Sequence, residues 1–141
     1  MASLDSIITS PTTWAIIIGT VPSLIWLLYW HHLDRERPEP RGLIALCFLL
    51  GGASVLIATL LQNALKGIVT DPTTRITVWA AIEELLKFGV FYLVAWKSDY
   101  DNDALDPAMY LIAVALGFAA VENVFYVLHP GTVFNITASL L

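Results

Sequence analysis

The apolar segment at residues 76–96 is long enough to cross a lipid bilayer as a helix, yet it contains Glu83, Glu84 and Lys87. A membrane-spanning helix needs ~20 mostly apolar residues, and ionisable residues inside one are rare and functional by default. At about 100° per residue, Lys87 lies one turn beyond the two carboxylates and between them in azimuth. Such residues cost roughly 2.5–3.5 kcal/mol each at mid-helix, so we expect other helices to pack around this polar face.

The composition places the whole chain in a membrane. Of its 141 residues, 57% are hydrophobic and 13% are charged, against about 25% charged in soluble domains. This length suits a single integral-membrane domain, residues 1–141, in a multi-pass protein of the cell membrane. The net charge of -5 includes no basic patch, which argues against nucleic-acid binding. Cys47 is the one cysteine, which excludes disulfides and thiolate zinc sites within the chain.

The pattern predicts an all-α fold, namely a polytopic membrane helix bundle with four complete transmembrane helices and a partial fifth at the carboxyl end. The four complete helices are expected at residues 12–30, 43–65, 76–96 and 107–128. The apolar stretch 133–141 is expected to begin the fifth. The lysines and arginines that flank these segments favour an outside amino terminus.

Local signals mark three of the expected helices. Pro22 predicts a kink in the first. The small residues 51–54 predict that another helix approaches the second closely. Asp106 before Pro107 is typical of an N-cap residue followed by proline at the first helical position, so Asp106 is expected to cap the fourth.

Two helices with carboxylates at similar depth are expected to meet. Glu122, followed by Asn123, lies late in the fourth expected helix, opposite Glu83 and Glu84 in the third. Carboxylates close together in a low dielectric do not all ionise, so one would hold a proton while another is available as a base. This pairing suits water activation. The base takes a proton from a water molecule that attacks an amide carbonyl, and the protonated carboxyl gives its proton to the leaving amine. Lys87 or Asn123 would steady the oxyanion.

The predicted catalytic residues are therefore Glu83, Glu84, Glu122, Lys87 and Asn123. The base is one of the two neighbouring glutamates. Glu83 is predicted to pair with Lys87, because a glutamate four residues before a lysine is the better-oriented pair on a helix. That spacing favours Glu84 as the residue that faces the reaction.

Several motifs occur in a fixed order along the chain. They are Asp34-Arg35-x-x-Pro38-Glu39-Pro40 after an aromatic-rich first helix, Glu83-Glu84-x-x-Lys87, Asp106-x-x-x-Tyr110, and Gly117-Phe118-Ala119-Ala120-x-Glu122-Asn123-x-x-Tyr126. This ordered set resembles the PrsW intramembrane protease family, which is related to the CAAX prenyl proteases, over most of the chain. The resemblance implies a multi-helix membrane peptidase whose paired glutamates at 83 and 84 form the active site with the Phe118-to-Glu122 segment.

The carboxyl end departs from the family pattern. Family members carry further membrane helices with a histidine motif, and His129 is the one histidine after Glu122. The resemblance therefore implies a truncated member, the amino-terminal part of a longer family domain. A divalent ion would take Glu83, Glu84, Glu122 and His129 as ligands, but Lys87 would add positive charge beside it. We expect a glutamate mechanism without a metal or another cofactor.

Three functions fit these residues. The leading hypothesis is an intramembrane endopeptidase that hydrolyses a peptide bond in a membrane-bound protein substrate, within the lipid bilayer. The first alternative is a proton- or cation-coupled transport module, because buried carboxylates on facing helices also build ion relays. Such transporters usually have repeated halves, which the sequence does not display. The second alternative is an inactive, protease-like membrane scaffold, which the missing histidine motif would favour.

Overall fold

The computed structural model describes residues 10–33, 39–96, 98 and 105–128. Its elements are α2 (Pro11–Leu33), α3 (Arg41–Leu65), α4 (Pro72–Val94) and α5 (Asp106–Leu128). The all-α prediction is confirmed, and each helix overlaps one of the four predicted segments. The expected start of a fifth helix, at residues 133–141, lies outside the described residues.

Three of these helices, α2, α3 and α5, are long and apolar enough to cross a membrane. α4 is as long as α2 but carries three charged residues near its middle. Large apolar side chains cover the outward faces, and Leu28, Leu60 and Leu93 are all more than half exposed. Apolar surface on this scale is stable against lipid and not against water. The structure therefore suits a multi-pass membrane protein.

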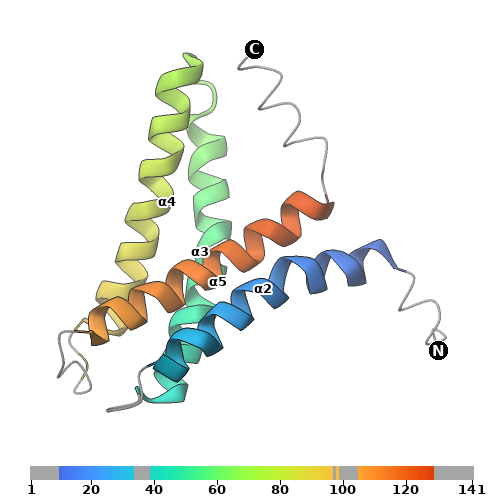
Figure 1. Cartoon of the computed structure of the whole chain (residues 1–141). Helices are drawn as coiled ribbons and strands as arrows, with labels where there is room; N and C mark the ends of the chain where they lie inside the picture. Colours follow the sequence, from blue (N-terminus) through green and yellow to red (C-terminus); the bar gives the residue numbers. More distant parts are fainter. Residues whose placement is uncertain (1–9, 34–38, 97, 99–104, 129–141) are drawn as a thin grey trace.

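α5 is the central helix, because it contacts each of the other three. In Figure 1, α3 and α4 run side by side in opposite directions, and α5 crosses them obliquely with α2 alongside it. Among the described helices, α2 contacts α5 alone. The amino ends of α3 and α5 and the carboxyl ends of α2 and α4 gather at one end of the bundle (Figure 1).

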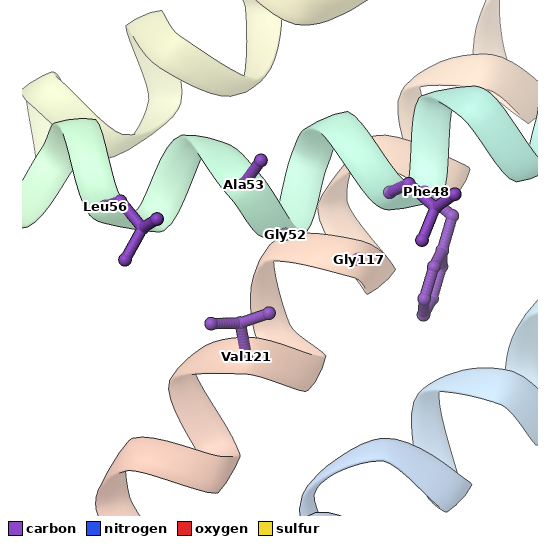
Figure 2. A pocket seen from close by; sticks show the side chains of 7 residues that line it. Phe48, Gly52, Ala53, Leu56, Gly117 and Val121 are labelled. Carbon is purple, nitrogen blue, oxygen red and sulfur yellow. The ribbon is translucent and has the colours of Figure 1, made fainter.

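α3 and α5 cross with their backbones in contact. A methyl group at Gly117 would meet the carbonyl of Phe48, and one at Gly51 would meet the carbonyl of Val114. Figure 2 shows Gly52 and Gly117 where the two ribbons cross. Only glycine leaves room for this approach. The small residues of α3 therefore allow the close packing predicted for them, and their partner is α5.

Two buried apolar clusters lie on opposite sides of this glycine contact. The larger lies toward the amino ends of α3 and α5 and consists of Ile44, Cys47, Phe91, Ala95, Tyr110, Ala113 and Val114. The smaller consists of Val55, Ala58 and Phe118, against which Ile82, Leu86 and Val121 pack. Both clusters contain residues of α3 and α5, so the crossing helices are joined on each side of the contact.

α4 begins at Pro72 and not at the predicted residue 76. Its N-cap is Asp71, whose side chain accepts a hydrogen bond from the Thr74 backbone N–H at 2.8 Å. That hydrogen bond lowers the pKa of Asp71, because it stabilises the carboxylate. The Asp-Pro signature that predicts a cap at Asp106 therefore applies at Asp71 as well.

Asp106 differs from its predicted role. α5 begins at Asp106 itself, and the Leu105 carbonyl accepts a hydrogen bond from the Met109 N–H at 3.1 Å. Asp106 thus lies in the first turn, where its negative charge is favoured by the positive end of the helix. Its side chain is 2% exposed, a burial that a cap position does not by itself predict.

Candidate active site

The ionisable residues of α4 pair differently from the prediction. Lys87 Nζ contacts Glu84 Oε1 at 2.7 Å, as an ion pair between residues three apart. The predicted pair between Glu83 and Lys87 is therefore wrong. The Glu84 side chain is 73% exposed, whereas that of Lys87 is 15% exposed. Glu84 is thus largely exposed among the described helices, and its role as the residue that faces the reaction stays a prediction.

A residue of α3 explains this pairing. Gln62 Nε2 donates a hydrogen bond to Glu83 Oε1 at 2.9 Å. Lys87 lies between the two glutamates in azimuth and reaches either of them. With Glu83 held by Gln62, the lysine pairs with Glu84. The balance between two helix-surface ion pairs is only a few tenths of a kcal/mol, so one neighbouring amide is enough to decide it.

Gln62 is a site residue that the sequence prediction missed. Its place near the end of a hydrophobic helix is also typical of a residue that reaches the headgroup region. The usable signal is the amide itself, because a polar side chain within an apolar helix needs a hydrogen-bonding partner on a neighbouring helix. In the structure that partner is the carboxylate of Glu83.

Lys87 also joins α4 to α5. Its Nζ lies over the ring of Phe118, 4.5 Å from the ring centroid, which is a cation–π contact. Phe118 is 1% exposed and belongs to the smaller buried cluster. Glu122 follows Phe118 by four residues, so the two side chains lie on the same face of α5. The contact between Lys87 and Phe118 therefore brings the charged face of α4 to the glutamate of α5.

Glu122 is partly buried and lies within electrostatic reach of three charges on α4. These charges are Glu83, Lys87 and Glu84. Tyr126, one turn further along α5, is in turn within reach of Glu122 and Glu83. Glu83 and Lys87 of α4 thus lie within electrostatic reach of Glu122 on α5, and Gln62 of α3 is hydrogen-bonded to Glu83.

Asn123 is exposed and lies about 100° from Glu122 around the helix. Lys87, the other residue predicted to steady an oxyanion, contacts Glu84 on α4 and Phe118 on α5. Among the five predicted catalytic residues, Glu84 and Asn123 therefore face outward in the part of the chain that the structure describes.

An apolar groove opens beside the α3–α5 crossing, with a volume of about 250 Å³. Its lining is Phe48, Leu49, Gly52, Ala53, Leu56, Gly117 and Val121. Figure 2 shows Leu56 on α3 and Val121 on α5, with Gly52 and Gly117 to the right of both where the two ribbons cross. The lining includes no carboxylate, so the groove is a separate feature from the cluster around Glu83 and Glu122.

The carboxylate cluster is a candidate site for a metal ion. Among the residues that the structure describes, no three His, Cys, Asp or Glu side chains are placed to share one ion. A catalytic zinc takes three protein ligands. Glu83 and Glu122 supply two, while Glu84 is turned outward onto Lys87. These residues by themselves do not fit a metal, and His129 lies outside the described residues.

Sequence comparisons relate the chain to known proteins. A family model described as PrsW family intramembrane metalloprotease matches residues 39–138. The chain is similar to Protease PrsW of Geobacillus kaustophilus, with 32% identity over 129 residues, 89% of this chain and 57% of the relative. It is also similar to Protease PrsW of Oceanobacillus iheyensis, with 30% identity over 116 residues, 80% of this chain and 54% of the relative. The chain spans a little over half the length of these curated relatives. No solved structure matches it.

Proposed function

Because the chain belongs to the PrsW family of intramembrane proteases, we propose that it carries the paired carboxylates of a membrane endopeptidase. The substrate is a peptide bond in a protein that itself lies in the membrane. The observation that supports this proposal most directly is the contact of Lys87 on α4 with Phe118 on α5, one turn before Glu122, with Glu83 close enough to act on Glu122 through its charge.

In the proposed reaction Glu83 is the base. It takes a proton from a water molecule whose oxygen attacks the carbonyl carbon of the scissile amide. Gln62 holds one oxygen of Glu83, and a carboxylate has a second oxygen that remains an acceptor for the water. This choice replaces Glu84, whose side chain is turned outward and paired with Lys87.

Glu122 and Lys87 complete the proposed reaction. Two carboxyls that share a low-dielectric site hold one proton between them, and that proton passes to the leaving amine as the carbonyl–nitrogen bond breaks. The positive charge of Lys87 steadies the oxyanion of the tetrahedral intermediate. Glu84 balances part of the Lys87 charge through their ion pair. The products are a carboxylic acid and an amine.

The proposal includes the membrane topology. α4 crosses the bilayer with α2, α3 and α5 as a fourth span in one domain, residues 1–141, whose residues 133–141 begin a fifth span. Aromatic residues near the ends of α2 and α4 support this, because the pairs Trp26–Tyr29 and Tyr92–Trp96 lie toward the same end of the bundle, as in an interfacial belt. An impermeant thiol reagent should label a single cysteine in the 66–71 turn from one side of the membrane only, and labelling from both sides would contradict the topology.

The main experiment compares three glutamine variants of the full-length protein, reconstituted in lipid with a membrane-tethered peptide substrate. Glutamine keeps the size of the side chain but can neither accept the proton of water nor donate one to the amine. Glu83→Gln and Glu122→Gln should each lower kcat by about 100-fold or more, the usual size of a general acid or base effect. Glu84→Gln should lower it much less, because Glu84 contacts neither the water nor the amide.

Two outcomes would contradict the proposal. If Glu83→Gln and Glu122→Gln both kept wild-type turnover with unchanged thermal unfolding, the carboxylate pair would not perform the chemistry, and the transport alternative would become the better one. Dialysis against EDTA is the second arm. Full activity after dialysis agrees with a glutamate mechanism, whereas loss of activity that a divalent metal restores would show a metal-dependent mechanism, as the family name metalloprotease suggests.

A further inference from the structure

Three polar side chains are almost completely buried at the end of the bundle where α3 and α5 begin. Glu39 is 5% exposed, Asp106 is 2% exposed and Tyr110 is 0% exposed. The proposed reaction uses none of them. Burial of polar groups in an apolar bundle is costly unless they are hydrogen-bonded, so the contacts they make identify what the cluster does.

Tyr110 and Glu39 join two distant parts of the chain. The Tyr110 hydroxyl donates a hydrogen bond to Glu39 Oε2, between residues 71 apart in the sequence. Glu39 is in turn attached firmly to α3, because the next residue, Pro40, accepts hydrogen bonds from Leu43 and Ile44 at 2.9 and 3.1 Å. Tyr110 belongs to the larger buried cluster of α3, α4 and α5. The hydrogen bond therefore ties the start of α3 to the second turn of α5.

The glycine contact between α3 and α5 is a point about which α5 can rotate on α3, so the hydrogen bond between Tyr110 and Glu39 affects their crossing angle. Gly117 of α5 lies against Phe48 of α3, which fixes how closely the two helices approach. The close contacts of Gly51 and Gly117 lie together at one crossing point, which still permits one helix to rotate on the other. Tyr110 lies ~10 Å along α5 on one side of Gly117, and Glu122 lies ~7.5 Å along it on the other, at 1.5 Å per residue. A rotation that displaces Tyr110 therefore displaces Glu122 in the opposite direction.

We propose that the hydrogen bond from Tyr110 to Glu39 is a lock that sets the angle of α5 on α3, and through it the position of Glu122 relative to Glu83. Both lock residues are positioning residues, because neither lies at the carboxylates of the proposed reaction. A hydrogen bond suits this task since it is directional, whereas the apolar contacts around it tolerate small rotations. The effect on catalysis rests on the proposed function, but the effect on geometry does not.

The geometric test measures the distance between α4 and the far arm of α5. Spin labels are attached to cysteines at Leu85 and Val127, which are 70% and 40% exposed, after Cys47→Ala removes the native thiol. Tyr110→Phe deletes only the donating hydroxyl, and it should shift and broaden the distribution of distances between the labels. The matched control is Tyr92→Phe, which removes a hydroxyl from a 46% exposed tyrosine of α4 and should leave the distribution unchanged.

The kinetic test separates positioning from general destabilisation. Tyr110→Phe should lower kcat by about tenfold or more with little change in KM, because small misplacements of reacting groups cost this much. Glu39→Gln keeps a carbonyl oxygen that accepts from Tyr110, so it should retain the wild-type distances and most of kcat. Glu39→Leu should lose both. Adding Tyr110→Phe to Glu39→Leu should cost nothing further, because the two changes remove the same bond.

The outcomes are distinguishable. Wild-type distances in Tyr110→Phe would overturn the lock, and so would a fall in Tm with distances and kcat unchanged. If the distances change in Tyr110→Phe but the wild-type protein cleaves no substrate, the lock stands and the proposed function falls. If cleavage is intact and both distances and kcat are unaffected by Glu39→Leu, the proposed function stands and the lock falls.

Discussion

The two polar regions of this bundle lie on opposite arms of the α3–α5 crossing, and they differ in how completely the protein encloses them. In the first region Glu39 and Tyr110 are 5% and 0% exposed and contact each other directly. In the second, Glu83 and Glu122 are both partly exposed and interact with each other through their charges.

This difference in exposure explains how glutamates in the two regions can have different roles. A buried glutamate whose oxygen accepts a hydrogen bond from a buried tyrosine is held in one geometry. A glutamate at a partly open helix surface keeps an oxygen available to a water molecule or an amide. We therefore assign the enclosed region to holding the helices and the open region to chemistry. The following variants test this division, beginning with the largest expected effect.

Gly117→Ala should damage both regions at once. Its added methyl group would meet the backbone carbonyl of Phe48, which cannot turn away as a side chain can. Overpacking of this kind costs about 1–3 kcal/mol or more, and it should lower Tm and activity together. Gly89→Ala is the matched control, since nothing lies within 4 Å of a methyl group there, and it should leave Tm unchanged or slightly raised. Equal Tm values for the two variants, measured by thermal unfolding in detergent, would contradict the backbone contact.

Gln62→Leu should damage only the open region. Leucine has a similar volume but donates no hydrogen bond, so Glu83 would lose the group that orients it. Because a hydrogen bond to a charged group contributes about 1.5–3 kcal/mol, we expect kcat to fall about tenfold or more while Tm changes little. Asn63→Ala, a change at the exposed neighbouring amide, is the control and should keep kcat. A large fall in Tm without a change in kcat would show that Gln62 holds the helices together and does not orient Glu83 for the reaction.

Asp71 lies in neither region, and its effect should be the smallest. Its pKa is lowered by the hydrogen bond from Thr74, so it stabilises the fold above its ordinary unfolded pKa, and that contribution is lost as the pH falls through the folded pKa. Asp71→Ala should lower Tm slightly at neutral pH and not at all in strong acid. Asp71→Ser, which can still cap the helix, should retain Tm at both. Melting curves of the three proteins across pH check this, and an unchanged difference between wild type and Asp71→Ala in acid would contradict it.

The helices themselves could be predicted from the sequence with small errors at their ends. Apolar runs of membrane length and the charged loops between them are local properties, so α3 and α5 were located within one or two residues. α4 begins four residues before the expected residue 76, because Asp71 and Pro72 cap and open the helix although they precede its apolar run. The need for partner helices around the charged face of α4 also follows from local cost alone.

The candidate site could be predicted only in part. The face of α4 that carries Glu83 and Lys87, and its encounter with Glu122, follow from helical spacing and the cost of charge in lipid. Helical spacing describes one helix in isolation, so it paired Lys87 with Glu83, whereas in the structure Lys87 pairs with Glu84. Gln62 belongs to another helix, and no pattern within α4 reports where that amide lies.

The sequence by itself determined that this chain forms apolar helices in a membrane. It also determined that some of these helices carry carboxylates that need polar partners on neighbouring helices. Those properties depend on neighbouring residues and on the energy of charge in lipid, which a single chain segment contains in full. The tertiary structure alone decided that Lys87 pairs with Glu84, that Gln62 holds Glu83, and that Tyr110 reaches Glu39. Each of those choices is a small energy difference between alternative partners, and it is settled only when helices far apart in the sequence come into contact.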